Sequence, residues 1–259
     1  MTSRPRLSEV EAFVESPDQR RLFLRAWRPG SVRAVVAVVH APGSGSARYR
    51  FFAEALAEHR IATYAIDLRG CGGSSGSRAR SLNDHLLDIQ SMMSRIKQCE
   101  PDTPVFLLGH GTSAVVACHH ALQHAAELEG VIGEATLLDA PWRVSLWRKF
   151  RRLVHALRLP RTALFRPDQR GCEALGGLSL PLLLLHGSED RVAPPSDSEC
   201  LHRCVSARDK TLQVFEGFDH ELINGRGHAL VREKIVQWIE EQLGSSHHRR
   251  RIGIEYINP

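Results

Sequence analysis

The pattern of hydrophobic and polar residues changes along this chain, from strict alternation near the N-terminus to continuous apolar runs further on. Two N-terminal stretches, SEVEAFVES and RLFLRAWRP, alternate apolar and polar residues, and the second runs into Pro-Gly. This pattern predicts an antiparallel hairpin at the edge of a sheet. Continuous apolar runs follow, and such runs are typical of strands buried in a parallel sheet. They cover residues 34–40, 61–67, 105–110, 135–140, 180–186 and 211–217.

Stretches with helical spacing separate these apolar runs. RYRFFAEALAEHR keeps its apolar residues on one face, and HALVREKIVQWIEEQL does the same near the C-terminus. Residues 81–98 begin with Ser81 and Asp84 three positions apart, which resembles a capping box at a helix start. Alternating strands and helices predict one α/β domain over residues 1–259, with a doubly wound, mostly parallel sheet. Ligands of such sheets bind beyond the carboxyl ends of the strands.

Residues 141–179 interrupt this rhythm, because they hold no clear strand. Apolar residues recur there at helical spacing among basic ones, so an inserted helical cap over the strand ends is expected. Residues 142–166 carry eight Arg and Lys and no acid, whereas the whole chain has a net charge of +5. A solvated helix explains this pattern, and so does a surface that attracts an anionic ligand, a carrier protein or a membrane surface. Trp142 and Trp147 would give this cap an apolar wall suited to an acyl ligand.

Composition narrows the function classes. An apolar fraction of 42% and a charged fraction of 24% are ordinary for a globular protein. The first residues lack the apolar core of an export signal, so a cytoplasmic location is expected. No recognised nucleic-acid motif accompanies the basic residues, so nucleic acid is not an expected partner. Residues 244–259 include HHRRR and are expected to form a flexible tail.

The six cysteines lie scattered without a CxxC pair, and reduced thiols are therefore expected. Cys200 and Cys204 are one helical turn apart with His202 between them. A structural zinc site needs four converging ligands, and no second pair of ligands stands out. Neither a metal nor a cofactor is predicted.

Four sequence stretches together carry a family resemblance. They are HAPGSGSARY (40–49), DLRGCGGSSG (67–76), LLLLHGSEDRVAPP (182–195) and GFDHELIN (217–224). In this order they resemble α/β-hydrolases of the monoacylglycerol lipase and lysophospholipase type, the serine-aminopeptidase-like S33 group, from about residue 10 to 243. The resemblance implies an α/β-hydrolase fold with a short cap. It also implies that Asp190 is the catalytic acid and His220 the base, with His40 and His110 beside the pocket.

The resemblance fails at the nucleophile. VFLLGHGTSA (105–114) follows the pattern G-x-S-x-G of this fold, but Gly111 stands at the position of the serine. One oxyanion donor corresponds to Pro42, which has no backbone N–H. The second donor, the N–H of Thr112, is retained. Loss of one such donor lowers the rate by about 10²- to 10³-fold, and loss of a triad serine by roughly 10⁶-fold. Ordinary hydrolysis through a serine at residue 111 is therefore excluded.

Several explanations stay open at this point. A different hydroxyl could serve as nucleophile, but Ser113 lies about 200° around the helix from residue 111 and should face away from His220. The Asp190–His220 dyad could act alone as general base on an apolar acyl- or polyketide-like molecule, in a non-serine hydrolysis, cyclisation or lyase-type step. The cavity could also bind a small molecule without converting it. Gly111 could, finally, be an engineered replacement of serine. The sequence favours an enzyme that uses the dyad.

Overall fold

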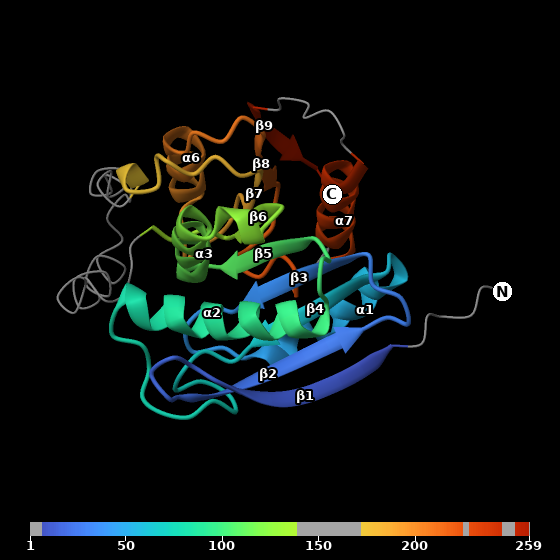
Figure 1. Cartoon of the computed structure of the whole chain (residues 1–259). Helices are drawn as coiled ribbons and strands as arrows, with labels where there is room; N and C mark the ends of the chain where they lie inside the picture. Colours follow the sequence, from blue (N-terminus) through green and yellow to red (C-terminus); the bar gives the residue numbers. More distant parts are fainter. Residues whose placement is uncertain (1–6, 139–171, 225–227, 245–251, 259) are drawn as a thin grey trace.

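The computed structural model describes residues 7–138, 172–224, 228–244 and 252–258. Within these ranges all strands belong to one sheet (Figure 1). The strands are β1 (Ser8–Glu15), β2 (Arg21–Arg28), β3 (Ala34–Val39), β4 (Ile61–Ile66), β5 (Val105–His110), β6 (Gly130–Glu134), β7 (Leu182–Gly187), β8 (Lys210–Phe215) and β9 (Ile252–Ile257). Their order across the sheet is β1-β2-β4-β3-β5-β6-β7-β8-β9.

The predicted edge hairpin is confirmed. Strands β1 and β2 pair antiparallel with Phe13 opposite Phe23, and β2 also pairs antiparallel with β4. From β4 to β9 all neighbouring strands run parallel. Every residue of β3, β4 and β5 is buried, as the continuous apolar runs predict for strands covered on both faces.

Strand β6 differs from the prediction, which put a strand at residues 135–140. The strand ends at Glu134. Its glycines are required by close packing: a Cβ on Gly130 would lie 2.6 Å from the Trp238 ring, and one on Gly133 would lie 2.7 Å from Leu184. Two glycines and a glutamate hide this strand from a search for apolar runs.

Helices cover both faces of the sheet (Figure 1). Helices α2, α3 and α6 contribute to one apolar core, and α1 and α7 contribute to the core on the opposite face. The predicted capping box is confirmed at the start of α2, where Ser81 and Asp84 satisfy each other's backbone N–H groups. The helices are α1 (Arg50–Glu58), α2 (Leu82–Cys99), α3 (Thr112–Gln123), α6 (Pro195–Cys204) and α7 (His228–Gly244), with 3-10 turns η1 (Ser46–Tyr49) and η2 (Ala125–Glu127).

The C-terminal residues correct a second expectation. Part of the stretch expected to be a flexible tail forms strand β9, which pairs parallel with β8 from Lys210↔Ile252 to Phe215↔Ile257. Alternating residues of IGIEYI suit a strand at a sheet edge, and this signal lies behind the basic HHRRR stretch that suggested a tail. Ile252 and Tyr256 are exposed on this outer strand.

One cysteine pair corrects the expectation of reduced thiols. Cys172 and Cys204 form a disulfide between residues 32 positions apart, with 5.9 Å between their Cα atoms. Spacing in the sequence gave no sign of this pair, because the chain between the two residues makes strand β7 and returns through α6. Free thiols are retained by Cys71, Cys99, Cys118 and Cys200.

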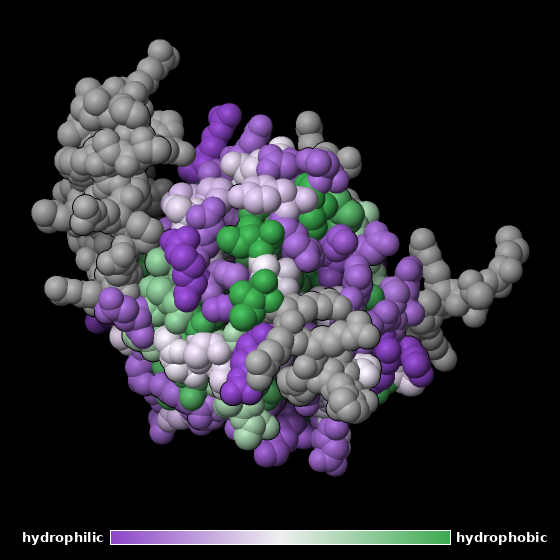
Figure 2. Space-filling model, turned by 90° about the horizontal axis from the view of Figure 1, so that it is seen from above, coloured by the Kyte–Doolittle hydropathy of each residue, from purple (hydrophilic) through white to green (hydrophobic). Residues whose placement is uncertain are grey.

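Figure 2 shows a face on which hydrophilic side chains dominate and hydrophobic ones gather in small areas. Among the described residues, no helix combines the length and apolar character that crossing a bilayer requires. Most of the expected cap, 141–179, lies outside the described residues, as do Trp142 and Trp147.

Candidate active site

An imidazole and a carboxylate meet beyond the carboxyl ends of β7 and β8. Nδ1 of His220 lies 2.7 Å from Oδ2 of Asp190. The Asp190 side chain is fully buried, whereas 17% of the His220 side chain is exposed. A carboxylate can only accept this hydrogen bond, so Nδ1 carries the proton and Nε2 keeps its lone pair. The structure thus brings together the two residues that the sequence singled out as acid and base.

Asp190 is held by contacts that keep its carboxylate ionised. Oδ1 accepts hydrogen bonds from the backbone N–H groups of Val192 and Ala193, at 2.7 Å and 2.8 Å. Oδ2 lies 3.3 Å from Nε2 of His186, a buried residue that the sequence analysis did not identify. Burial alone would raise the pKa of Asp190, but the hydrogen bonds from His186 and His220 outweigh it and hold the pKa well below its usual value.

The same contact makes His220 a stronger base than an ordinary histidine. Burial lowers the pKa of an imidazole, but the hydrogen bond and the negative charge of Asp190 prevail, and the pKa of His220 is raised above 6.5. A carboxylate hydrogen-bonded to Nδ1 of an imidazole is also the geometry of the acid and base in a catalytic triad.

Gly111 occupies the sharp turn between β5 and α3. Its φ of 63° and ψ of −123° are a backbone conformation that side chains rarely adopt. Space is nevertheless present, because a Cβ at this position would meet only Ala41, at 3.7 Å. Gly109 has a different reason to be glycine, since a Cβ there would lie 2.2 Å from the carbonyl oxygen of Ser113. The turn is therefore strained, and it carries no side chain at the residue where the sequence motif predicts one.

Of the two positions expected to donate to an oxyanion, only Thr112 has a backbone N–H. Thr112 is the first residue of α3, and N–H groups in the first turn of a helix have no acceptor within that helix. Pro42 lies in a tight turn that is closed by a 3.0 Å hydrogen bond from the Ser44 N–H to the Ala41 carbonyl. A proline in this turn supplies no donor.

His40 is held by backbone contacts on both sides of its ring. Its Nδ1 lies 2.8 Å from the Ala41 carbonyl, and its Nε2 accepts a 3.0 Å hydrogen bond from the Leu68 N–H. Both ring nitrogens are therefore engaged by backbone groups, and the ring is buried. Ser113 also bonds to this region, because its hydroxyl donates to the His40 carbonyl.

His110, in contrast, lies against the candidate base. The His110 and His220 rings are 4.8 Å apart between centroids. His110 is buried, and neither of its nitrogens has a hydrogen-bond partner in the described part of the chain. Burial and the neighbouring His220 lower the pKa of His110 to about 3, so its ring stays neutral.

The DLRGCGGSSG motif stabilises its own loop. Asp67 accepts hydrogen bonds from the backbone N–H groups of Ser46 and Gly73. Arg69 forms a buried ion pair with Asp88, 2.8 Å from nitrogen to oxygen, and also contacts Asp18. The Arg69 contacts thus join this loop to helix α2 and to the turn between β1 and β2.

A cluster of three sulfur atoms lies between residue 172 and α6. The sulfurs of Cys172, Cys200 and Cys204 lie within 4.8 Å of one another, which is close enough to share a metal ion. Two of these sulfurs are bonded to each other in the disulfide. His202, the residue between the two cysteines of α6, lies 3.3 Å from the Lys210 carbonyl.

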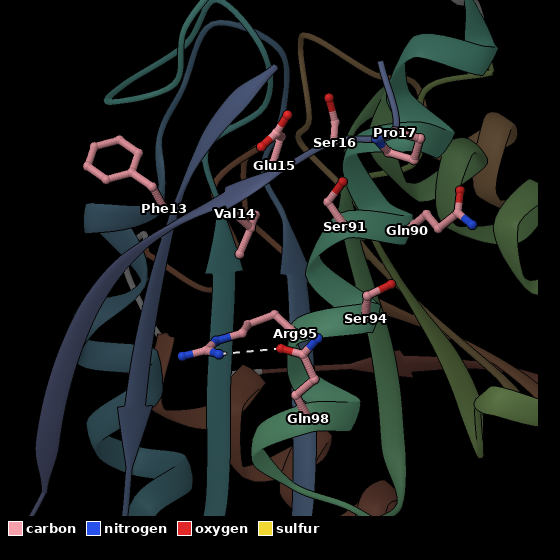
Figure 3. A pocket seen from close by; sticks show the side chains of 10 residues that line it. All are labelled: Phe13, Val14, Glu15, Ser16, Pro17, Gln90, Ser91, Ser94, Arg95 and Gln98. Atoms are coloured by element: carbon pink, nitrogen blue, oxygen red, sulfur yellow. Dashed lines mark hydrogen bonds between the residues drawn. The ribbon is translucent and has the colours of Figure 1, made fainter. Parts of the chain in front are cut away.

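A groove on the outside of the molecule is distinct from the dyad (Figure 3). It has a volume of about 590 Å³ and lies between the end of β1 and one side of α2. Its lining contains none of the predicted site residues. The lining residues are Phe13, Val14, Glu15, Ser16, Pro17, Gln90, Ser91, Ser94, Arg95 and Gln98.

Comparison with known proteins identifies relatives over most of the chain. Residues 30–174 and 168–226 match the family described as Serine aminopeptidase, S33. The monoacylglycerol lipase of Mycolicibacterium smegmatis is 24% identical, over 86% of this chain and 94% of that protein. Human monoglyceride lipase is 27% identical, over 79% of this chain and 81% of that protein. An uncharacterized abhydrolase domain-containing protein of Dictyostelium discoideum is 29% identical over 91% of this chain, which spans only 29% of that longer protein.

Solved structures resemble this chain across nearly its whole length. The monoacylglycerol lipase of Paleococcus ferrophilus superposes with a TM-score of 0.66 at 20% identity, covering 92% of this chain and 99% of that one. A carboxyl esterase from Bacillus coagulans, solved with glycerol, gives a TM-score of 0.72 at 18% identity, covering 92% of this chain and 100% of that one. At these identities the likeness is one of fold.

Proposed function

Because the chain belongs to the serine aminopeptidase S33 family and has its α/β-hydrolase fold, we propose that it is a lipase- or esterase-like protein that works without a serine nucleophile. In this proposal His220, oriented by Asp190, is the general base. The supporting observation is the 2.7 Å contact between His220 Nδ1 and Asp190 Oδ2. It leaves Nε2 free to accept a proton from water or from a substrate.

The reaction class follows from the groups at the turn after β5. Gly111 offers no atom that could form an acyl-enzyme, and Ser113 is committed to the His40 carbonyl. His220 would therefore activate a water molecule, or take a proton from the substrate in a cyclisation or lyase-type step. A well-placed general base accelerates a reaction by about 10²- to 10⁴-fold, which suffices for an activated substrate.

The substrate class is an apolar acyl or polyketide-like small molecule. Relatives named as monoacylglycerol and monoglyceride lipases support an acyl ligand. A further structural neighbour, DcsB, was solved with a substrate analogue and superposes with a TM-score of 0.73 at 13% identity. The basic residues of 142–166 would favour an anionic ligand, a carrier protein or a membrane surface as an additional partner.

Substitution of the base tests this proposal. The wild-type protein and His220→Ala are incubated with activated acyl esters, acyl thioesters and β-hydroxyacyl compounds, and the products are followed by mass spectrometry. We expect conversion of at least one class, reduced about 10²-fold or more in His220→Ala. His59→Ala is the matched control, because His59 is exposed and contacts Glu240 away from the dyad. Equal rates in the wild type and His220→Ala would refute the proposed base.

A silent binding protein is the second candidate function. Two differences from the catalytic pattern of hydrolases favour this function: Gly111 has no reactive side chain, and Pro42 has no backbone N–H that could donate to an oxyanion. Retained binding of an acyl compound by both the wild type and His220→Ala, with no product from either protein, would establish this function instead.

A further inference from the structure

Glu134 places a carboxyl group inside the apolar core beneath the candidate base. It ends strand β6, and its Cα pairs with that of His110 on the neighbouring strand β5. Side chains alternate along a strand, so His110 points to the same face of the sheet as Phe106 and Leu108. That face carries the core formed by α1 and α7. Neither Glu134 nor its position was identified from the sequence, where the residue stands among apolar and small neighbours.

The two carboxyl oxygens of Glu134 differ in their surroundings. Oε1 accepts a 2.9 Å hydrogen bond from the Ile223 N–H. Oε2 is buried, has no hydrogen-bond partner among the described residues and lies 4.0 Å from Nδ1 of His110. Burial raises the pKa of Glu134 to about 7. The carboxyl group thus holds a proton through part of the neutral pH range, and the unpaired Oε2 is the oxygen that can carry it.

His110 joins this carboxyl to the dyad. One side of its ring lies near Glu134 Oε2, and the ring also packs against His220. Burial is the largest influence on the pKa of both Glu134 and His220, and Asp190 is the next largest on that of His220. The charges of Glu134 and His220 act on each other in addition. Ionised Glu134 raises the pKa of His220, and protonated His220 lowers the pKa of Glu134.

We propose that Glu134 is a positioning residue for the proposed reaction: with His110 it forms an acid–imidazole pair beneath His220, and the charge of this pair adds to that of Asp190 in setting how readily His220 accepts a proton. The proposal rests on the proposed role of His220 as base. When His220 takes up a proton, Glu134 releases its own more easily, so the buried site gains less than one full positive charge. Such compensation eases proton transfer in a site of low dielectric.

Other ionisable groups lie around Glu134 and His110, and their charges also act on the pKa values of these two residues and of His220. Arg48 and Glu221 form an ion pair. Their charges have opposite effects on the pKa of His110, which Glu221 raises and Arg48 lowers. The Tyr49 hydroxyl is buried, and burial together with the Glu134 charge raises the pKa of Tyr49 well above its usual value. The ionisable groups that surround the pair are Arg48 and Tyr49 of η1, Asp190 after β7, and His220 and Glu221 after β8.

Titration of His220 by nuclear magnetic resonance tests the coupling without any substrate. Histidine ring signals are followed against pH in the wild-type protein, Glu134→Gln and Glu189→Gln. Glutamine preserves the acceptor for the Ile223 N–H but cannot ionise. We expect the His220 midpoint to fall by up to about one pH unit in Glu134→Gln. Glu189→Gln is the matched control, because Glu189 is exposed beside Asp190. The His220 midpoint in Glu189→Gln should equal that in the wild-type protein.

A reciprocal measurement keeps the proposal testable if Glu134→Gln does not fold. The Glu134 carboxyl signal is titrated in carbon-13-labelled wild-type protein and in His220→Gln, where the midpoint should rise because the neighbouring cation is lost. An unchanged His220 midpoint in folded Glu134→Gln, or an unchanged Glu134 midpoint in His220→Gln, overturns the proposal. Both experiments are independent of turnover, so a failure of the proposed reaction and a failure of this coupling are separate results.

Discussion

The Ser113 hydroxyl donates a hydrogen bond to the His40 carbonyl, with 2.8 Å between the two oxygens. This contact ties the first turn of α3 to the end of β3, directly beside the turn at Gly111. Ser113 is fully buried, so its hydroxyl serves the fold.

Replacement of Ser113 by alanine tests whether its hydroxyl stabilises the fold or takes part in a reaction. Ser113→Ala leaves a buried carbonyl without its donor, and we expect a loss of about 1 to 3 kcal/mol in the free energy of unfolding. Turnover of any substrate found for the wild type should be unchanged. Urea unfolding and kcat/KM measure the two effects. A folded Ser113→Ala protein without activity would identify Ser113 as a relocated nucleophile.

Gly111→Ser should create esterase activity toward short activated esters. The new hydroxyl would stand where this fold carries its nucleophile, and the Cβ has room beside Ala41. A side chain at a φ of 63° costs about 1 to 3 kcal/mol of stability. Gly111→Ala is the control, since it adds the same strain without a hydroxyl. Absence of an acyl-enzyme by mass spectrometry in a folded Gly111→Ser protein would contradict the prediction.

The missing oxyanion donor should limit that new activity. Adding Pro42→Gly to Gly111→Ser restores a backbone N–H at residue 42. We expect kcat to rise by about 10²-fold over Gly111→Ser alone. The same rate in both variants would mean that residue 42 does not contribute to the oxyanion site.

Asp190→Asn should move the pH dependence of turnover toward acid. The reactive form of His220 is unprotonated, so the rate rises with pH through its raised pKa. Without the carboxylate, burial dominates and lowers that pKa, so the rise begins at lower pH while the maximal rate falls. A pH–rate profile of both proteins checks this prediction. A profile of Asp190→Asn that superimposes on that of the wild type would exclude the dyad.

The Asp190–His220 pair also makes stability depend on pH. The lowered pKa of Asp190 gives stability that is present above its unfolded value near 3.9 and is lost on acidification. The raised pKa of His220 gives stability that is present below its unfolded value near 6.5 and is lost as pH rises through the folded pKa. The stability difference between wild type and Asp190→Asn should thus be largest between about pH 4 and 6.5. Chemical unfolding across this range measures it, and a difference that is constant with pH would argue against the pair.

Removal of the disulfide should destabilise the fold. For a loop of 32 residues, restriction of the unfolded chain corresponds to about 3 to 4 kcal/mol. The double variant Cys172→Ser, Cys204→Ser is compared with the oxidised wild type by urea unfolding. Cys99→Ser is the control, because Cys99 is a partly exposed free thiol. Equal stability of the double variant and the wild type would show that the bond does not form in solution.

Patterns of burial and turn chemistry predicted most of the fold. The hairpin, the buried parallel strands and the Ser81 capping box each follow from residues close together in sequence. Strand β6 was misplaced because packing against Trp238 and Leu184 requires glycine at Gly130 and Gly133, and this requirement exists only in the assembled sheet.

The part of the candidate site that lies in recognisable sequence motifs could be predicted. Asp190 and His220 follow strands in stretches whose resemblance to the family pointed to them, and the structure places them in contact. Glu134 was not predictable in this way, because it joins the site through the pairing of β6 with β5. His186 was missed although it lies only four residues before Asp190 in the same stretch. The backbone contacts of His40 at Ala41 and Leu68 were not predictable from the sequence either.

Strand β9 has a practical consequence for work with this protein. It pairs with β8 as far as Ile257 and shields the hydrogen-bonding edge of that apolar strand. A shortened version ending at Gly244 would turn β8 into an open template for another molecule. Variants trimmed before β9 should therefore be screened for self-association before their activity is compared.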